Sequence, residues 1–334
     1  MPATTIKDVA SAAGVSIATV SYVINNGPRP VSAETRQRVL EAMKRLAFEP
    51  NVSARRLRLQ YNNVLGLAVA GLSGRPGIAD LYFLDTLCGI SIAADRLDYD
   101  LMLFSNHPKL QTEEYFQALA RRRIVDGLIA SGGAVNPRGL ELLPGAGLPV
   151  VVVGRQQPVA GLCQIEFSYQ EDAFKATSAL IRRGHRRIGL LLNAPIFLSE
   201  RQRLAGYQLA LSEAGLPVDP ALIYSAPQVE VFPPREAVQR LASQAGVTAL
   251  ITAPFREVCG FLQEMSAGSR GAWEVATLDY DDRAPRPANL VVGIRQAKFE
   301  AGARAVELLV QAIRGSQALP ESDILASTFV FGEG

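Results

Sequence analysis

Beyond residue 63 the chain alternates short β-rich runs with amphipathic helical stretches, and this alternation constrains the fold more than any other feature. The β-rich runs are 64–70, 100–104, 127–130, 150–153, 164–167, 187–192, 247–252, 274–278 and 290–294. The helical stretches between them are 82–97, 112–123, 170–183, 200–214 and 297–314. Because parallel strands need crossover helices, the pattern predicts doubly wound parallel sheets that are covered on both faces.

So many strands fit two sheets better than one, and we therefore expect residues 62–334 to form a core of two α/β lobes. The expected lobes are 62–163 with 294–320, and 164–293 with 321–334. A cleft between two such lobes is a favoured place for a small ligand.

The sequence of residues 1–49 predicts a small all-α domain with well-capped helices. Thr5 and Asp8 have the spacing of a capping box, and Gly14 is placed to end the helix that they begin. Ser16 and Ser32 are expected to cap a second and a third helix.

The second helix is expected over 17–24 and the third from residue 33 to about residue 46. Apolar residues recur along the third helix at separations of three, four and seven positions, which predicts one buried face. The residues of that face are Val39, Leu40, Met43 and Leu46.

Residues 50–61 are expected to form a hinge between the head and the core. Asn51 can cap a short helix over 52–58, but two turns with several arginines are too short and too charged to be stable alone. We therefore predict that this helix forms only with a partner.

Positive charge is concentrated in the first 60 residues, where nine basic and four acidic residues give a net charge of +5, against +2 for the whole chain. A basic head on a mildly acidic body is typical of a polyanion-binding module joined to a module of another kind.

Residues 6–25 have the spacing of a helix-turn-helix. Ala10 is small where a second helix would cross, Gly14 makes the turn, and Val15 and Val20 are expected to be buried against the first helix. Small and hydroxylated side chains would then face outward and suit a major groove, although a helical hairpin that only packs is the alternative. The outward-facing residues are Ser16, Ile17, Ala18, Thr19, Ser21, Tyr22 and Asn25.

Two runs in the head, TIKDVASAAGVSIATVSYVINN and VSAETRQRVLEAMKRLAFEPNVSARRLR, resemble the DNA-binding head of the LacI/GalR repressor family. The motifs RRGHRRIGLL, SERQRLAGYQLAL, LDYDD and IRQAKFEAG resemble that family's core, which is similar to periplasmic sugar-binding proteins. The resemblance covers nearly the whole chain. It implies a dimeric transcriptional regulator, most often a repressor, that binds a pseudo-palindromic operator under the control of a small-molecule effector.

On the DNA side, the resemblance implies that Ile17, Ala18 and Tyr22 contact base edges. Family members usually have Arg at the position of Tyr22, and Tyr cannot make the bidentate guanine contact of an Arg. The residues implied to hold phosphates are Thr5, Ser16, Thr19, Ser21 and Asn25. Those implied in the hinge are Asn51, Ala54, Arg55 and Leu57, with Leu57 wedged into the minor groove at the operator centre.

On the effector side, the implied and candidate residues are Tyr82, Phe83, Arg203, Phe232, Phe255, Asp281 and Gln296. An Arg and an Asp can bracket a polyol or a sugar acid, while aromatic rings cover its apolar side. The alternatives are that Tyr82 and Phe83 belong to the core and that Arg203 and Asp281 form interlobe ion pairs.

Two departures from the family bear on the ligand. Ala253-Pro254-Phe255 stands where many members have Ala-Asn-Asp, and Ser168-Tyr169 stands where many have Asp-Asn. The loss of two polar groups and the gain of an aromatic ring leave room for a more apolar or an anionic effector.

Other classes of function fit less well. An enzyme would need a phosphate loop or a catalytic cluster, and a secreted solute-binding protein would need a signal peptide. Three cysteines without C-x-x-C spacing indicate buried thiols in a reducing compartment. We therefore expect a cytoplasmic protein without cofactor or metal, with double-stranded DNA and an effector as partners and no membrane. The lack of a terminal heptad segment favours a homodimer over a tetramer.

Overall fold

The computed structural model describes residues 4–25, 30–48, 61–69, 79–105, 112–131, 135–154, 159–193, 198–226, 235–244, 246–253, 273–284, 286 and 289–332. The chain divides into two compact units, Met1–Asn62 and Asn63–Gly334, which we call the head and the core. Within these described ranges, no helix has the length and apolar character needed to cross a membrane.

The head contains three helices, α1 (Ile6–Ala13), α2 (Ile17–Asn25) and α3 (Ala33–Arg45). The predicted capping box is present at α1, where the backbone N–H of Thr5 donates to the Asp8 carboxylate at 2.8 Å. Gly14 follows α1 with φ at 65°, a left-handed conformation that favours glycine. The hydroxyls of Ser16 and Ser32 cap α2 and α3 as predicted, each accepting from the backbone N–H three residues on.

The three helices of the head bury one apolar cluster, to which Val9, Val20 and Val39 contribute fully buried side chains. One prediction for α3 is wrong, since the side chain of Leu40 is 48% exposed. The buried face runs through Val39 and Ala42 instead, because Leu40 lies one residue step, about 100°, away from Val39 around the helix.

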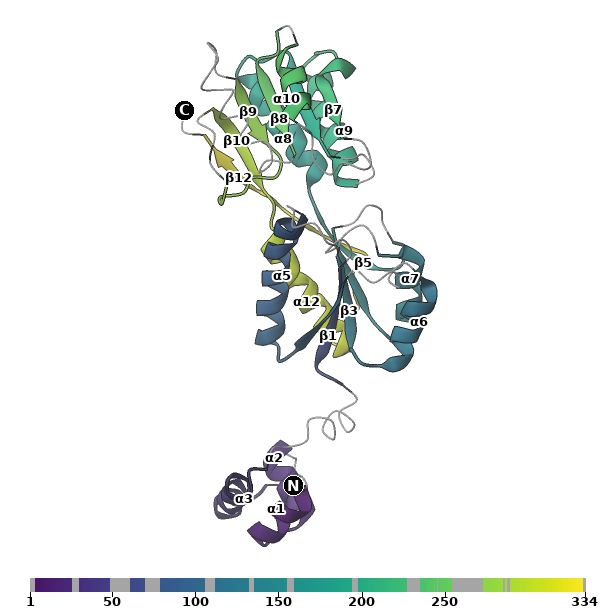
Figure 1. The fold of residues 1–334 in the computed structure, drawn as a ribbon, viewed down its shortest axis with the longest axis vertical. Helices are drawn as coiled ribbons and strands as arrows, with labels where there is room; N and C mark the ends of the chain where they lie inside the picture. The colour runs from purple at the N-terminus through teal and green to yellow at the C-terminus, as the bar shows by residue number, and fades with distance from the viewer. Residues whose placement is uncertain are drawn as a thin grey trace. The chain divides into compact units, whose positions relative to one another are not determined.

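The first lobe of the core is built on a six-stranded parallel sheet in the order β11-β5-β4-β3-β1-β2. Its strands are β1 (Val64–Val69), β2 (Asp100–Ser105), β3 (Gly127–Ser131), β4 (Val150–Val153), β5 (Cys163–Phe167) and β11 (Ser322–Leu325). Two helices, α5 (Ala79–Arg96) and α12 (Lys298–Ile313), cover one face, and α6 (Glu113–Arg122) and α7 (Pro137–Gly145) cover the other (Figure 1).

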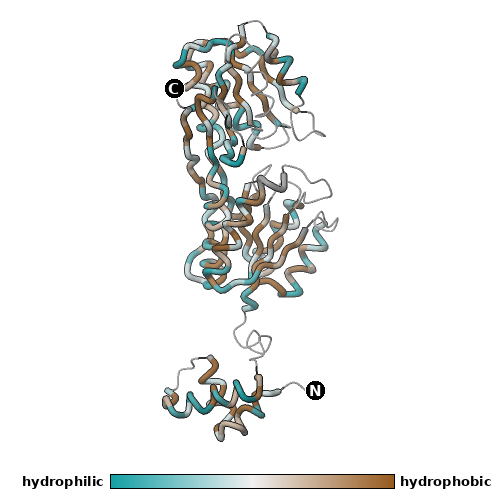
Figure 2. Tube along the Cα trace, turned by 60° about the vertical axis from the view of Figure 1, so that its left-hand side comes forward, coloured by the Kyte–Doolittle hydropathy of each residue, from teal (hydrophilic) through white to brown (hydrophobic). Residues whose placement is uncertain are grey.

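The second lobe has a six-stranded sheet in the order β12-β10-β9-β8-β6-β7. Its strands are β6 (Ile188–Leu192), β7 (Ile223–Ser225), β8 (Ala249–Thr252), β9 (Glu274–Thr277), β10 (Leu290–Arg295) and the antiparallel edge strand β12 (Thr328–Phe331). Helices α8 (Tyr169–Arg182) and α9 (Leu198–Glu213) cover one face and α10 (Arg235–Ala242) covers the other, and a 3₁₀ turn, Pro220–Leu222, precedes β7. The strands of both lobes carry much of the apolar sequence (Figure 2).

Glycines let the paired helices of each lobe approach closely. A Cβ on Gly302 of α12 would lie 2.1 Å from the carbonyl oxygen of Thr86 in α5. A Cβ on Gly206 of α9 would lie 2.1 Å from the carbonyl oxygen of Gln170 in α8. Since neither backbone oxygen can move independently, both contacts require glycine.

The two-lobed α/β architecture is as predicted, but the boundary between the lobes differs. The strand predicted at 164–167 was assigned to the second lobe, whereas β5 pairs with β4 and β11 in the first. The same pairing moves 322–325 into the first lobe. The chain therefore crosses between lobes after β5, after β10 and after β11, so that each lobe is completed by segments distant in sequence.

Candidate functional site

The predicted recognition surface of the head lies on α2 and the turn before it. Ser16, Ile17 and Ala18 are exposed, while Val20 and Val23 of the same helix are buried. The side chain of Ile17 is 44% exposed at the first position of α2. Its apolar surface is therefore available to a partner such as a thymine methyl group.

The hydroxyls near this surface also hold the helix end. The Ser16 hydroxyl lies 2.9 Å from that of Thr19 and accepts from the Thr19 backbone N–H at 3.1 Å. Ser21 and Tyr22 are partly buried on the same helix, and Thr5 is exposed at the start of α1. A helix N-terminus with spare backbone N–H groups favours an anion such as a phosphate.

Several predicted residues lie outside the described part of the chain. These are the hinge residues Asn51, Ala54, Arg55 and Leu57 and the effector candidates Phe232 and Phe255. Asn25 belongs to α2 and Tyr82 to α5, but their side chains are also outside the described part.

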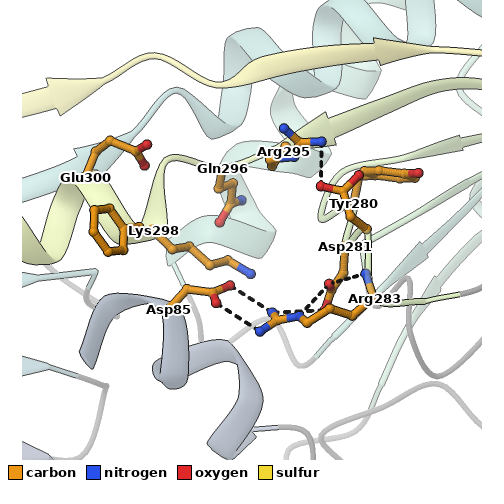
Figure 3. A pocket seen from close by; sticks show the side chains of 10 residues that line it. Asp85, Tyr280, Asp281, Arg283, Arg295, Gln296, Lys298 and Glu300 are labelled. Atoms are coloured by element: carbon orange, nitrogen blue, oxygen red, sulfur yellow. Dashed lines mark hydrogen bonds and ion pairs between the residues drawn. The ribbon is translucent and has the colours of Figure 1, made fainter. Parts of the chain in front are cut away.

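The core contains a cavity of about 320 Å³ to which both lobes contribute (Figure 3). Asp281 and Gln296, which were predicted from separate motifs, lie together in its wall. Asp281 follows β9 and Gln296 follows β10, so both come from the carboxyl ends of parallel strands, where ligands of such sheets bind. The lining residues are Asp85, Tyr280, Asp281, Asp282, Arg283, Arg295, Gln296, Lys298, Phe299 and Glu300.

Arg283 joins the two lobes at this cavity. Its guanidinium donates to both carboxylate oxygens of Asp85 on α5, at 2.9 and 2.8 Å, and to Asp281 at 2.8 Å (Figure 3). The hydrogen bonds that Asp281 and then Asp85 accept raise the pKa of Arg283 above its usual value. Asp281 thus takes part in an interlobe network, which the sequence analysis gave as the alternative to a ligand contact. Asp281 also lines the cavity.

Arg203 is buried in α9 beside this cavity. It donates to the Glu200 carboxylate at 2.6 Å and to the Leu278 carbonyl at 3.3 Å, and its guanidinium lies 5.1 Å from the centre of the Tyr169 ring. Gln296 donates to the same carbonyl at 3.5 Å, which places Arg203 next to a lining residue. The ion pair of Arg203 with Glu200 lies within one helix.

Phe83 belongs to the apolar cluster between the first sheet and the paired helices α5 and α12, and it is 8% exposed. The packing role that the sequence left open for Phe83 is therefore the one that the structure supports.

The structure adds functional candidates that the sequence reasoning missed. Asp85 lies one turn after Tyr82 on α5, and Lys298 lies two residues after Gln296, where its amino group donates to Asp279 at 2.6 Å. Glu200 and Arg283 are the direct partners of predicted residues. The only signal in the sequence was that each of these four residues lies within three positions of a predicted residue. That signal is weak, because charged residues near helix starts are common.

His185 follows α8 and takes part in a separate polar cluster. Its ring nitrogens lie 2.7 Å from the Thr248 hydroxyl and 2.8 Å from Glu274. The hydrogen bond from Arg183 is the main cause that lowers the pKa of Glu274 to about 2. The described residues include no group of His, Cys, Asp and Glu suited to hold a metal ion.

Family comparisons match most of the chain. Bacterial regulatory proteins of the lacI family match residues 5–51. The periplasmic binding proteins and sugar binding domain of the LacI family match residues 75–231, and the periplasmic binding protein-like domain matches residues 177–333.

Two relatives match most of the chain. The HTH-type transcriptional regulator DegA of Bacillus subtilis (strain 168) is 30% identical over 273 residues, which cover 80% of this chain and 77% of DegA. The HTH-type transcriptional repressor PurR of Haemophilus influenzae (strain PittEE) is 30% identical over 318 residues, 92% of this chain and 91% of PurR.

Among solved structures, the lac repressor dimer bound to operator and the anti-inducer ONPF aligns with a TM-score of 0.75 at 22% identity over 98% of both chains. The complex of the transcriptional regulator CelR with cellobiose aligns with a TM-score of 0.61 at 24% identity, over 99% of this chain and 100% of that chain. These two likenesses establish the fold.

A helix-turn-helix head joined to a two-lobed, effector-binding core defines a DNA-binding transcriptional regulator. The chain belongs to the LacI family of bacterial regulatory proteins.

Proposed function

We propose that this regulator binds a pseudo-palindromic operator as a homodimer and represses transcription in the cytoplasm, and that a small molecule in the core cavity controls its affinity for the operator. The observation that carries the proposal is the convergence of Asp281 and Gln296 on one cavity to which both lobes contribute. A ligand there would contact both lobes and could change their arrangement.

The proposed DNA contacts follow the exposed face of α2. Ile17, Ala18 and Tyr22 would face base edges, and the hydroxyls of Thr5, Ser16, Thr19 and Ser21 would hold phosphates together with Asn25. The described head also has basic residues outside α2, which supports a DNA partner.

The hinge would complete the operator complex. Asn51 would cap a hinge helix, Arg55 would approach phosphates, and Ala54 would let two such helices meet while Leu57 enters the minor groove. Effector control would then act through the spacing of two hinges beside the lobes.

The test starts with selection of an operator from random duplexes, followed by fluorescence anisotropy at several salt concentrations. The affinity should fall steeply with salt, because a dimer neutralises many phosphates. Ala18→Asp should weaken operator binding by about tenfold or more, since a carboxylate would face the DNA, whereas Gln37→Ala, at an exposed position of α3, should leave it unchanged. Failure to select any sequence over random DNA would contradict the proposal.

The effector is sought among sugars, sugar acids and related metabolites. Cellobiose is a reasonable first probe, since the CelR structure of the same fold contains it. A ligand at ~100 times its dissociation constant should stabilise the protein by about 2.7 kcal/mol and should change operator affinity. The sign of that change separates an inducer from a corepressor.

A further inference from the structure

The chain passes between the two lobes at three crossovers, and each of them is short. The first crossover is Ser168, between β5 and α8. The second is residues 296–297, between β10 and α12, and the third is residues 326–327, between β11 and β12. Segments of one or two residues have little slack, so a movement of one lobe against the other has to be taken up at these positions.

Sheet pairing keeps the third crossover beside both of the others. In the first lobe, Leu325 at the end of β11 pairs with Phe167 at the end of β5. In the second lobe, Thr328 at the start of β12 pairs with Arg295 at the end of β10. The first crossover continues into the second lobe as a helix, so strand pairing does not connect it to the other two crossovers on that side.

A hydrogen bond supplies this connection. The Ser327 hydroxyl donates to the carboxylate of Asp172, in the first turn of α8, at 2.7 Å. The backbone N–H of Asp172 donates to the carbonyl oxygen of Ser168 at 2.8 Å. Asp172 therefore contacts the first crossover through its backbone and the third through its side chain. The Lys175 amino group, which lies 5.3 Å from the centre of the Phe329 ring, adds a second contact between α8 and β12.

Burial makes the hydrogen bond between Ser327 and Asp172 costly to break. Asp172 is 4% exposed. Burial raises the pKa of its carboxyl group, while the hydrogen bond from Ser327 and the charge of Arg203 act in the opposite direction. A buried carboxyl group that loses its hydrogen-bond partner keeps the full cost of desolvation, so Ser327 is held more firmly than a hydroxyl at the surface would be.

We propose that the hydrogen bond between Ser327 and Asp172 joins the three crossovers into one hinge, and that it thereby sets the balance between the lobe arrangements on which operator affinity depends. Both are positioning residues in this scheme, because neither is among the described residues that line the cavity. The effect on operator affinity rests on the proposed function, whereas the joining of the crossovers does not.

Hydrogen exchange of the full chain, followed by mass spectrometry, tests the hinge. Ser327→Ala removes the donor, so the amides of residues 172–176 in α8 and 328–331 in β12 should exchange about tenfold faster or more. Ser327→Thr keeps a hydroxyl and should restore slow exchange. Ser322→Ala is the matched control, because it removes a hydroxyl from an exposed position of β11. Faster exchange that is confined to residues 328–331 would overturn the joining of the crossovers, as would unchanged exchange in both segments.

Operator affinity of the same variants, measured by anisotropy without added ligand, tests the effect on regulation. Ser327→Ala should change the affinity for the selected operator by about threefold or more, because it shifts the balance between lobe arrangements, and Ser327→Thr should restore it. Equal affinities of Ser327→Ala and the unaltered protein would overturn the regulatory effect, and so would an equal change in Ser322→Ala. If no operator can be selected, the regulatory effect falls together with the proposed function, while the exchange measurement still decides whether the crossovers are joined.

Discussion

Glu274 is a single side chain that joins β9 to the C-terminal end of α8 in the second lobe. It begins β9, and it accepts hydrogen bonds from Arg183 at the end of α8, at 2.6 and 2.5 Å, and lies within hydrogen-bond distance of His185. Its pKa is lowered to about 2, so its carboxylate stabilises the folded state above its ordinary value of 4.5, and this stabilisation is lost as the pH falls from there toward 2.

Glu274→Gln should therefore destabilise the protein by about 1–2 kcal/mol at neutral pH, with the difference from the unaltered protein shrinking below about pH 4.5. Urea unfolding of both proteins between pH 3 and pH 7 measures this difference in the free energy of unfolding. Glu141→Gln, at an exposed position of α7, is the control. A deficit in Glu274→Gln that stayed constant over this range would contradict the assigned ion pair.

Tyr22 lies in α2 at a position where the family resemblance implies an Arg in most members. Since a Tyr cannot make a bidentate contact with guanine and an Arg can, Tyr22→Arg should raise the preference for guanine at one symmetric operator position by about tenfold. Operator selection with both proteins reads the change base by base. Identical selected sequences would show that residue 22 does not face a base edge.

At the scale of elements, the sequence predicted what depends on local chemistry. The capping groups at Thr5, Ser16 and Ser32 form the hydrogen bonds that their spacing indicated. The strands β11 and β12 were missed, because they are short, and β11 is exposed at a sheet edge and lacks an apolar run. Helix α7 was missed because Pro144, a residue unfavourable inside a helix, interrupts the helical pattern near its end.

The site was only partly predictable for a related reason. Asp281 and Gln296 could be found because each follows a strand in a specific motif. The ion pair between Asp85 and Arg283 joins residues that lie far apart in sequence and belong to different lobes, so no local spacing indicates it.

The close contact between α5 and α12 gives a prediction for an element pair. Gly302→Ala should destabilise the core by several kcal/mol, because its Cβ would lie 2.1 Å from the Thr86 carbonyl oxygen and the helices would have to separate. Gly145→Ala, near the end of α7, meets nothing within 4 Å and should be neutral or slightly stabilising. Urea unfolding of both variants checks this, and equal stability of the two would contradict the helix contact.

At the scale of the whole molecule, the core should fold without the head, because each of the two units has its own apolar clusters. A protein that consists of residues 62–334 should keep cooperative unfolding and bind the same effector as the full chain, but it should not bind the selected operator. Calorimetry and anisotropy measure the two activities. Operator binding by this fragment would contradict the assignment of DNA recognition to the head.

The ion pair between Asp85 and Arg283 couples the two lobes, and its role should appear in regulation more than in stability. Both side chains are partly exposed, at 36% and 43%, so Asp85→Asn should change the free energy of unfolding by less than about 1 kcal/mol. The same change should alter effector affinity and operator affinity together, because it shifts the balance between lobe arrangements.

Linkage makes this prediction strict. The factor by which the effector changes operator affinity must equal the factor by which operator changes effector affinity. We expect Asp85→Asn to change this factor by about threefold to tenfold in both directions of measurement, while Asp95→Asn, at an exposed position further along α5, leaves it unaltered. An unchanged factor in Asp85→Asn would show that the pair does not participate in the transition, and the lobe movement would then have to be governed by the crossover segments after β5, β10 and β11.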